Sequence, residues 1–231
     1  MGAGSDYLGE IAARVGENLD ACRLDAFDVK TWMRERRIDI LVLGSGTIDI
    51  DIEDFKKLAK GTGVLIYPCV YGWPSGYRHV EFDGRGGQGG LPPELERGLA
   101  SRYWQQGGDG MYTFNWFPAQ KHLRYQVDLL AMIGDPKRLD GTDKIFAADR
   151  GSPQMVYPHN WMHTRLPMTL EPNQVGTVPI TLGPIATGSS APKTLQMHVE
   201  CDPLPKVQSF SIMLNGTRLP PGQVAGSRLV C

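Results

Sequence analysis

Residues 38–43 read IDILVL, and Gly44-Ser45-Gly46 follows them directly. An unbroken run of β-branched residues and leucines that ends in glycine is typical of a strand buried on both faces, as in a parallel sheet. Apolar residues at helical spacing then extend over Ile52–Ala59, and two glycines separate them from the next apolar run, Val64–Val70. This strand–helix–strand order predicts an α/β fold.

The same alternation extends in both directions along the chain. Helical spacing follows the first apolar run as far as Met33, and a helix starts at Pro93 and ends at Gly107-Gly108. The further predicted strands are Ile11–Val15, Met111–Phe117 and Ile145–Ala148, and the further predicted helix is Leu123–Ile133. Five strands that alternate with helices fit an open doubly wound sheet or part of a barrel, and periodicity does not choose between them.

The pattern changes at about Pro153, where prolines become frequent and helical spacing disappears. Three segments, Val178–Leu182, Leu195–Val199 and Phe210–Leu214, are predicted antiparallel strands, and Asn215-Gly216 after the last of them is a typical hairpin turn. We therefore predict two domains, an α/β domain over residues 1–152 and a partial, all-β, sandwich-like domain over residues 153–231.

The charge balance and hydropathy of the chain limit the classes of partner. Lysine and arginine number 24 and aspartate and glutamate 25, which gives a formal charge of −1. No basic surplus exists to neutralise a phosphate backbone, so nucleic acid is not expected as a partner. No apolar run approaches the roughly 20 residues that span a bilayer, and the N-terminal residues lack the apolar segment of a signal peptide. We expect a soluble chain and leave its compartment open.

No cofactor is predicted. The four cysteines lie far apart in the sequence and form no pair at metal-ligand spacing; they are Cys22, Cys69, Cys201 and Cys231. The glycine-rich segment 84–90 lacks the Lys-Ser/Thr ending of a phosphate-binding loop. Cys69 follows an apolar run and is interpreted as a small buried hydrophobic residue rather than as a catalytic thiol.

Four blocks of the sequence resemble the bacterial glycoside-hydrolase-like family 10 group, in the same order and at the same spacing. The blocks are residues 10–46, 64–74, 94–117 and 129–149. The more specific marks are Asp28 with Trp32, the motif WQQGGDG at residues 104–110, and Phe114-Asn115. Asn215-Gly216 and the tail around it are similar to the β-sandwich domain that follows the barrel in many such proteins.

The resemblance implies a fold and a substrate class. It implies a (β/α)8 TIM barrel with its active site on the loops at the carboxyl ends of the strands, and carbohydrate as the partner. If Ile145–Ala148 is the eighth strand, the chain holds about five βα units of the C-terminal part of the barrel. We then expect a fragment without the first three strands, whose open sheet edge allows self-association.

The resemblance also directs attention to carboxylates at strand ends. Retaining and inverting glycosidases use a pair of them on either side of the scissile bond. Glu17, at the end of the fourth strand on this count, is a candidate general acid, whereas Asn115 at the end of the seventh cannot be a nucleophile. Asp49 and Asp51 follow the next strand and are further candidates. The alternatives are a solvated loop or first-turn acid for Glu17 and a helix N-cap for Asp49 or Asp51.

Four other acids are interpreted as structural. Asp28 and Asp39 precede a helix and a strand, and Asp109 lies in a Gly-Asp-Gly turn before its strand. Asp149 follows the last strand and is given the same structural interpretation, although it could face the pocket.

Aromatic and polar side chains follow two of the predicted strands. Tyr71, Trp73 and His79 follow the run 64–70, and Asn115 and Trp116 follow the next one. Aromatic faces that stack on pyranose rings, together with hydrogen-bonding side chains, are typical of sugar sites. The alternative for Trp116 is packing over the top of the barrel. The sequence thus predicts a glycoside hydrolase or other carbohydrate-processing protein, or alternatively a non-catalytic carbohydrate-binding or surface-interaction protein on a barrel scaffold.

Overall fold

The computed structural model describes the chain in several stretches. They are residues 9–44, 46–71, 91–114, 123–149, 163–184, 194, 196–200, 211–220, 223–225 and 228–230. The chain divides into two compact units, Met1–Ala186 and Thr187–Cys231. The first unit includes the segment 163–184, which the sequence pattern grouped with the second domain. Each unit is described by itself.

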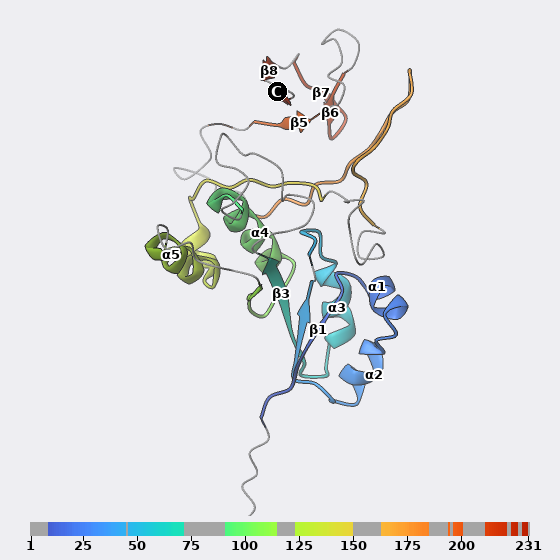
Figure 1. Ribbon diagram of the computed structural model, residues 1–231, viewed down its shortest axis with the longest axis vertical. Coiled ribbons are helices and arrows are strands. Elements are labelled where there is room, and N and C mark those ends of the chain that lie inside the picture. Colours follow the sequence, from blue (N-terminus) through green and yellow to red (C-terminus); the bar gives the residue numbers. More distant parts are fainter. Residues whose placement is uncertain are drawn as a thin grey trace, which may run out of the picture. The chain divides into compact units, whose positions relative to one another are not determined.

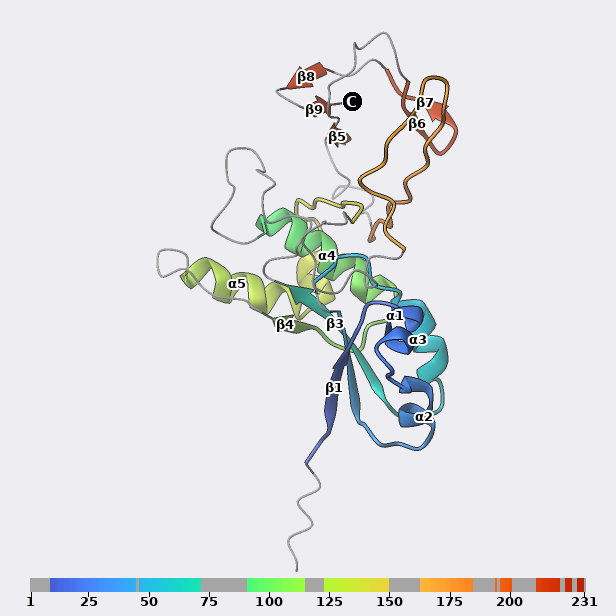
Figure 2. The same cartoon turned by 45° about the vertical axis from the view of Figure 1, so that its right-hand side comes forward.

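The first unit is built on a curled parallel sheet of four strands in the order β1-β2-β3-β4 (Figures 1 and 2). The strands are β1 (Ala12–Val15), β2 (Ile40–Leu43), β3 (Leu65–Tyr71) and β4 (Tyr112–Phe114). Their order in space is their order in sequence, and helices connect them, so the sheet is half of a barrel in its topology. The prediction of an α/β fold with alternating strands and helices is confirmed.

Helices follow each strand of this sheet. They are α1 (Leu19–Leu24), α2 (Val29–Arg34), α3 (Ile52–Ala59), α4 (Pro93–Gln105), α5 (Leu123–Ile133) and the 3₁₀ helix η3 (Pro136–Leu139). The bounds of α3 and α5 are the predicted ones. The predicted helical return after β1 is instead two helices, because Ala26 takes a left-handed φ of 61° and Asp28 starts a new helix by accepting a hydrogen bond from the Thr31 N–H at 3.1 Å.

The two faces of the sheet have different cores. The face toward the helices forms the main core, in which Leu41, Leu43 and Ile66 are fully buried. The other, concave face carries a small cluster of strand residues, and its buried members are Val42, Cys69 and Tyr71. Burial of β2 on both faces and of Cys69 as a small apolar residue is confirmed. Burial raises the pKa of the Cys69 thiol to about 12, which keeps it protonated.

The prediction of a fifth strand over Ile145–Ala148 is wrong. This segment has no strand structure and instead crosses helix α4, where the Ile145 N–H donates to the Glu94 carbonyl at 2.8 Å. Gly98 of α4 permits the approach, since a Cβ at this position would lie 2.0 Å from the Ile145 carbonyl oxygen. The apolar run is therefore partly buried against a helix, and the sequence of a short apolar run does not show whether it packs on a helix or lies in a sheet.

The prediction of a strand over Val178–Leu182 is also wrong. Residues 174–184 have no regular structure, and Gly183 lies against the α4 backbone at Ser101 and Arg102. A turn at residues 171–174 precedes this segment, with the Gln174 N–H donating to the Glu171 carbonyl at 3.0 Å.

The second unit contains short antiparallel strands. They are β5 (His198–Glu200), β6 (Met213–Leu214), β7 (Thr217–Arg218), β8 (Gln223–Ala225) and β9 (Arg228–Val230). β6 and β7 form a hairpin in which Asn215 and Gly216 have φ of 49° and 81°, the values that a type I′ turn requires. The hairpin prediction is confirmed, and β5 overlaps the predicted strand 195–199. The other three-stranded sheet has the order β5-β9-β8.

Candidate active site at the carboxyl edge of the sheet

The carboxyl ends of β1 and β2 meet at one edge of the sheet, where Glu17 and the loop 46–51 lie together. Glu17 is completely buried, and its Oε1 accepts a hydrogen bond from the Thr47 N–H at 3.2 Å. Its backbone carbonyl accepts another from the Asp51 N–H at 2.9 Å. The alternative of a solvated acid for Glu17 is therefore wrong. Its carboxylate is instead a buried anchor for the loop that follows β2.

A second anchor for this loop comes from helix α4. The Arg102 guanidinium, only 2% exposed, donates from Nη1 to Asp49 Oδ1 at 2.7 Å and from Nη2 to the Ile48 carbonyl. The Tyr103 hydroxyl donates to the same Ile48 carbonyl at 2.8 Å. Asp49 is thus committed to an ion pair with a buried cation, which is costly to break because the cation would remain without its partner.

Asp149 completes this network from the end of the segment that crosses α4. Its side chain is buried and accepts hydrogen bonds from the Ile48 and Asp49 N–H groups at 3.0 and 3.4 Å. Its own N–H donates to Asp49 Oδ2 at 2.9 Å. The structural interpretation of Asp149 is confirmed, as are those of Asp28 and Asp39, since Asp39 Oδ2 accepts from the Ile11 N–H at 2.8 Å.

Asp51 differs from Glu17 and Asp49 because its carboxylate contacts a histidine at the surface. It stands at the N-cap position of α3, as predicted, but its side chain makes no capping hydrogen bond. Instead, Asp51 Oδ2 lies 3.1 Å from His163 Nδ1, and His163 Nε2 lies 3.7 Å from Asp20 Oδ2. The three side chains are between 42% and 51% exposed, so a ligand can reach them.

The pKa of Asp51 is raised above its ordinary value. Burial is the larger cause, because it disfavours the charged carboxylate, and the hydrogen bond from His163 opposes the shift. A carboxyl group that keeps its proton to higher pH is suited to donate it in general acid catalysis.

The aromatic part of the predicted sugar site is described only at Tyr71. This side chain is 8% exposed and its ring lies 5.5 Å from the ring of Phe114. The Arg14 guanidinium lies 3.8 Å above the same Phe114 ring, so the concave face is partly filled by β1 and β4 side chains. The other predicted binding residues, Trp73, His79, Asn115 and Trp116, lie outside the described residues.

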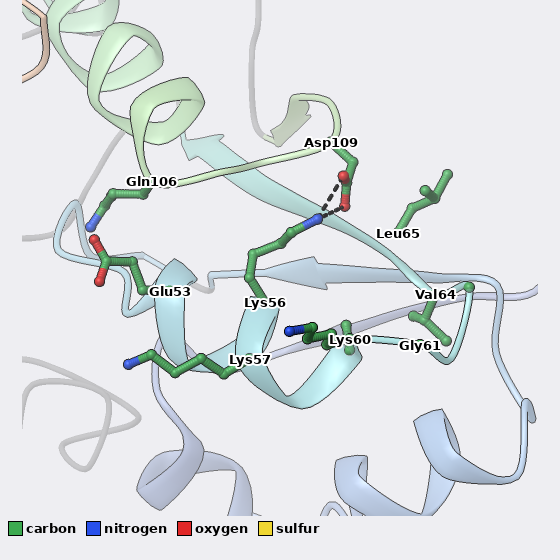
Figure 3. Close-up of a pocket in the computed structure, with 11 residues that line it drawn as sticks. Glu53, Lys56, Lys57, Lys60, Gly61, Val64, Leu65, Gln106 and Asp109 are labelled. Carbon is green, nitrogen blue, oxygen red and sulfur yellow. Dashed lines mark hydrogen bonds and ion pairs between the residues drawn. The ribbon is translucent and has the colours of Figure 1, made fainter.

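A separate depression lies at the amino ends of the strands, opposite the candidate site. Lys56, Lys57 and Lys60 line this depression, and Figure 3 shows Lys56 directed at Asp109. Lys56 Nζ lies 2.7 Å from both oxygens of Asp109, and Asp109 Oδ2 accepts from the Ile66 N–H at 2.8 Å. The structural interpretation of Asp109 is confirmed, and this end of a barrel serves stability rather than chemistry.

Sequence reasoning missed Arg102, Tyr103 and His163 as members of the site. Arg102 carries a detectable signal, because it stands seven residues after Leu95 and three after Leu99, on the apolar stripe of α4. A charged residue on such a stripe needs a partner. His163 carries no such signal, since its contact with Asp51 joins positions 112 residues apart.

The first unit is thus an α/β fold in which the carboxylates of Glu17, Asp49 and Asp51 lie at the carboxyl edge of a parallel half-barrel. No family model matches the chain, and neither does any of the curated proteins with which it was compared. Within the described ranges, no cluster of three or more histidine, cysteine, aspartate or glutamate side chains could hold a metal ion. The helices of the described part are all too short or too polar to cross a membrane.

Proposed function

We propose that the chain processes carbohydrate by glycoside hydrolysis at the carboxyl edge of the half-barrel, with Asp51 as the proton donor. The observation that carries the proposal is the Asp51–His163 contact at 3.1 Å, in which a half-exposed carboxyl group of raised pKa stands beside an imidazole. The place of this pair supports the proposal, because active sites of α/β barrels lie at the carboxyl ends of the strands.

Hydrolysis breaks the bond between the anomeric carbon and the oxygen of the leaving sugar, and that oxygen takes up a proton. A water molecule forms the new bond to the anomeric carbon and gives up a proton. Of the three predicted acids, Glu17 and Asp49 hold the loop 46–51 through hydrogen bonds from backbone N–H groups to their carboxylates. The carboxylate of Asp51 makes no capping hydrogen bond to the backbone of α3. In this proposal His163, whose Nδ1 lies 3.1 Å from Asp51 Oδ2, passes the proton that the water gives up back to Asp51. Trp73 and Trp116, from the segments after β3 and β4, are proposed to stack on the sugar.

A non-catalytic carbohydrate-binding protein is the second candidate. It is favoured because the side chains of Glu17 and Asp49 are both held in hydrogen bonds to the protein, whereas a retaining or inverting glycosidase needs a second carboxylate beside the proton donor. In this case the edge would bind sugar without turnover.

The test measures the release of reducing ends from a panel of oligo- and polysaccharides by the full chain, with Asp51→Asn as the variant. Asp54→Asn is the matched control, since Asp54 lies one turn along α3 and pairs with Lys57 at the surface. Hydrolysis that falls about 100-fold or more in Asp51→Asn and is kept in Asp54→Asn supports catalysis. Binding on a glycan array without turnover, lost in Trp116→Ala, supports the second candidate. Neither hydrolysis nor binding across the panel refutes both.

A further inference from the structure

We propose that two copies of this chain join their half-barrels into one closed eight-stranded parallel barrel. In this dimer, β4 of each copy pairs with β1 of the other around a twofold axis that coincides with the barrel axis. The proposal concerns assembly and does not depend on the proposed function.

The first observation is the state of the two sheet edges. Within the described strands, β1 pairs only with β2, and β4 pairs only with β3. All four strands are parallel, so the free edge of β4 and the free edge of β1 can join in the same parallel arrangement that connects the strands within the sheet. A twofold axis makes this joint twice, which leaves no edge open.

The second observation is the stagger of the strands. The register places Ala12 of β1 level with Ile40 and Leu65, whereas Tyr112 of β4 is level with Cys69, four residues further along β3. An eight-stranded α/β barrel closes with a total stagger of about eight residues. Each copy contributes a stagger of four residues between β1 and β4, so two copies supply the eight. The joint between copies then adds no further stagger and pairs Tyr112 with Ala12 of the partner subunit.

The third observation is where apolar side chains are exposed. Among the described residues between 9 and 149, seven large apolar side chains are exposed, and six of them belong to the βα units of β1 and β4. Those of the first unit are Ile11, Leu24 and Phe27, and those of the last are Tyr112, Val127 and Leu130. Val127 and Leu130 are three residues apart on α5 and are 59% and 46% exposed. Exposed apolar groups gathered at both ends of a sheet indicate a contact between those ends.

The concave face supplies the interior of such a barrel. In the described part of the chain its cluster consists of strand residues alone, with Ile40, Tyr67 and Phe114 only partly buried. Barrel interiors of this size are filled by layers of side chains from alternate strands, so a second copy would bury what one copy leaves half-open. The carboxyl edges of both copies would then form one ring, and each Asp51 would gain a second Asp51 at the same mouth.

The test begins with the mass of the full chain in solution, measured by light scattering over a concentration series. We expect a discrete dimer of twice the 25.5 kDa chain mass. Val127→Asp should weaken the dimer more than about tenfold, because a charge would be buried in the joint. Val175→Asp is the matched control, since Val175 is an exposed valine outside the two βα units and its replacement should leave the dimer intact.

A cross-linking measurement identifies the joint itself. In a background with Cys201→Ser and Cys231→Ser, the variants Ala12→Cys and Tyr112→Cys are treated with a short bismaleimide, separately and mixed. A covalent dimer only in the mixture supports the barrel, since the twofold axis separates like positions. The proposal is overturned if the chain is monomeric, or if its dimer persists in Val127→Asp and is lost in Val175→Asp. Cross-linking between two copies of the same cysteine variant also overturns it.

Discussion

Replacement of Gly98 by alanine should destabilise the first unit although alanine is the better helix former. The added Cβ would lie 2.0 Å from the Ile145 carbonyl oxygen and 2.9 Å from its carbon, and both are backbone atoms that a rotamer change cannot move away. The segment 145–149 must therefore shift by roughly an ångström to restore ordinary contact.

The shift determines the magnitude. It lengthens the bond from the Ile145 N–H to the Glu94 carbonyl and the hydrogen bonds that join Asp149 to the loop 46–51. At about 1 kcal/mol for each of about three bonds, the loss is about 3 kcal/mol, and the helix preference of alanine returns about 1 kcal/mol. We expect a net loss of about 2 kcal/mol in the free energy of unfolding, which corresponds to roughly 4–8 °C in Tm.

Urea unfolding followed by tryptophan fluorescence and far-ultraviolet circular dichroism measures this change. Gln105→Ala is the control, because Gln105 is exposed at the end of the same helix and reports helix preference without the clash. If Gly98→Ala proves as stable as the parent chain or more stable, the segment 145–149 does not pack on α4 as described, and the reasoning is refuted.

Four other measurements test single features of the first unit. Asp109→Ala should lower the free energy of unfolding by about 1–2 kcal/mol, because it leaves the Ile66 N–H without its acceptor. Lys56→Met removes only the ion pair with Asp109 and should lower the free energy of unfolding by less than about 1 kcal/mol. Equal losses for the two variants in urea unfolding would contradict this reasoning. His163→Ala removes the hydrogen bond that lowers the pKa of Asp51, so that pKa should rise further in an NMR titration of the carboxyl carbon; an unchanged or lower value would show that burial of Asp51 depends on His163. The pKa of Asp51 is higher in the folded chain than in the unfolded chain, where it is about 3.8. Its contribution to stability is therefore present below about pH 3.8 and is lost as the pH rises through the folded pKa. Asp51→Asn should flatten the free energy of unfolding as a function of pH in that range. The Cys22 and Cys69 thiols, whose pKa values burial raises to about 12, should escape iodoacetamide at mildly alkaline pH until urea unfolds the chain, and mass spectrometry of the peptides would reveal labelling in the native state.

The parts of the fold that the sequence predicted are those that local signals determine. Helices α3 and α5 have the predicted bounds because apolar spacing and flanking glycines or prolines act within a few residues. The run Ile145–Ala148 was misassigned because its apolar content reports burial and not the partner, which is α4. Prediction of the hairpin at Asn215-Gly216 succeeded because the turn itself selects those residues.

The candidate site shows the same division. The position of Glu17, Asp49 and Asp51 at the ends of strands followed from the strand pattern. Their different environments did not, because Glu17 is buried by a loop that begins about thirty residues later and Asp49 is held by Arg102 from α4. Such environments depend on contacts between distant parts of the chain, which composition and spacing do not encode.

The link from Asp149 to Ile48 and Asp49 has a consequence for the order of folding. It closes a loop of about a hundred residues, so the entropy of bringing these ends together opposes it until most of the unit is in place. During synthesis, β1, β2 and α3 leave the ribosome long before Asp149. The loop 46–51 therefore reaches its final shape late, after α4 has formed and Ile145 has packed against it, and a chain that stops short of Asp149 should have this edge of the sheet unfinished.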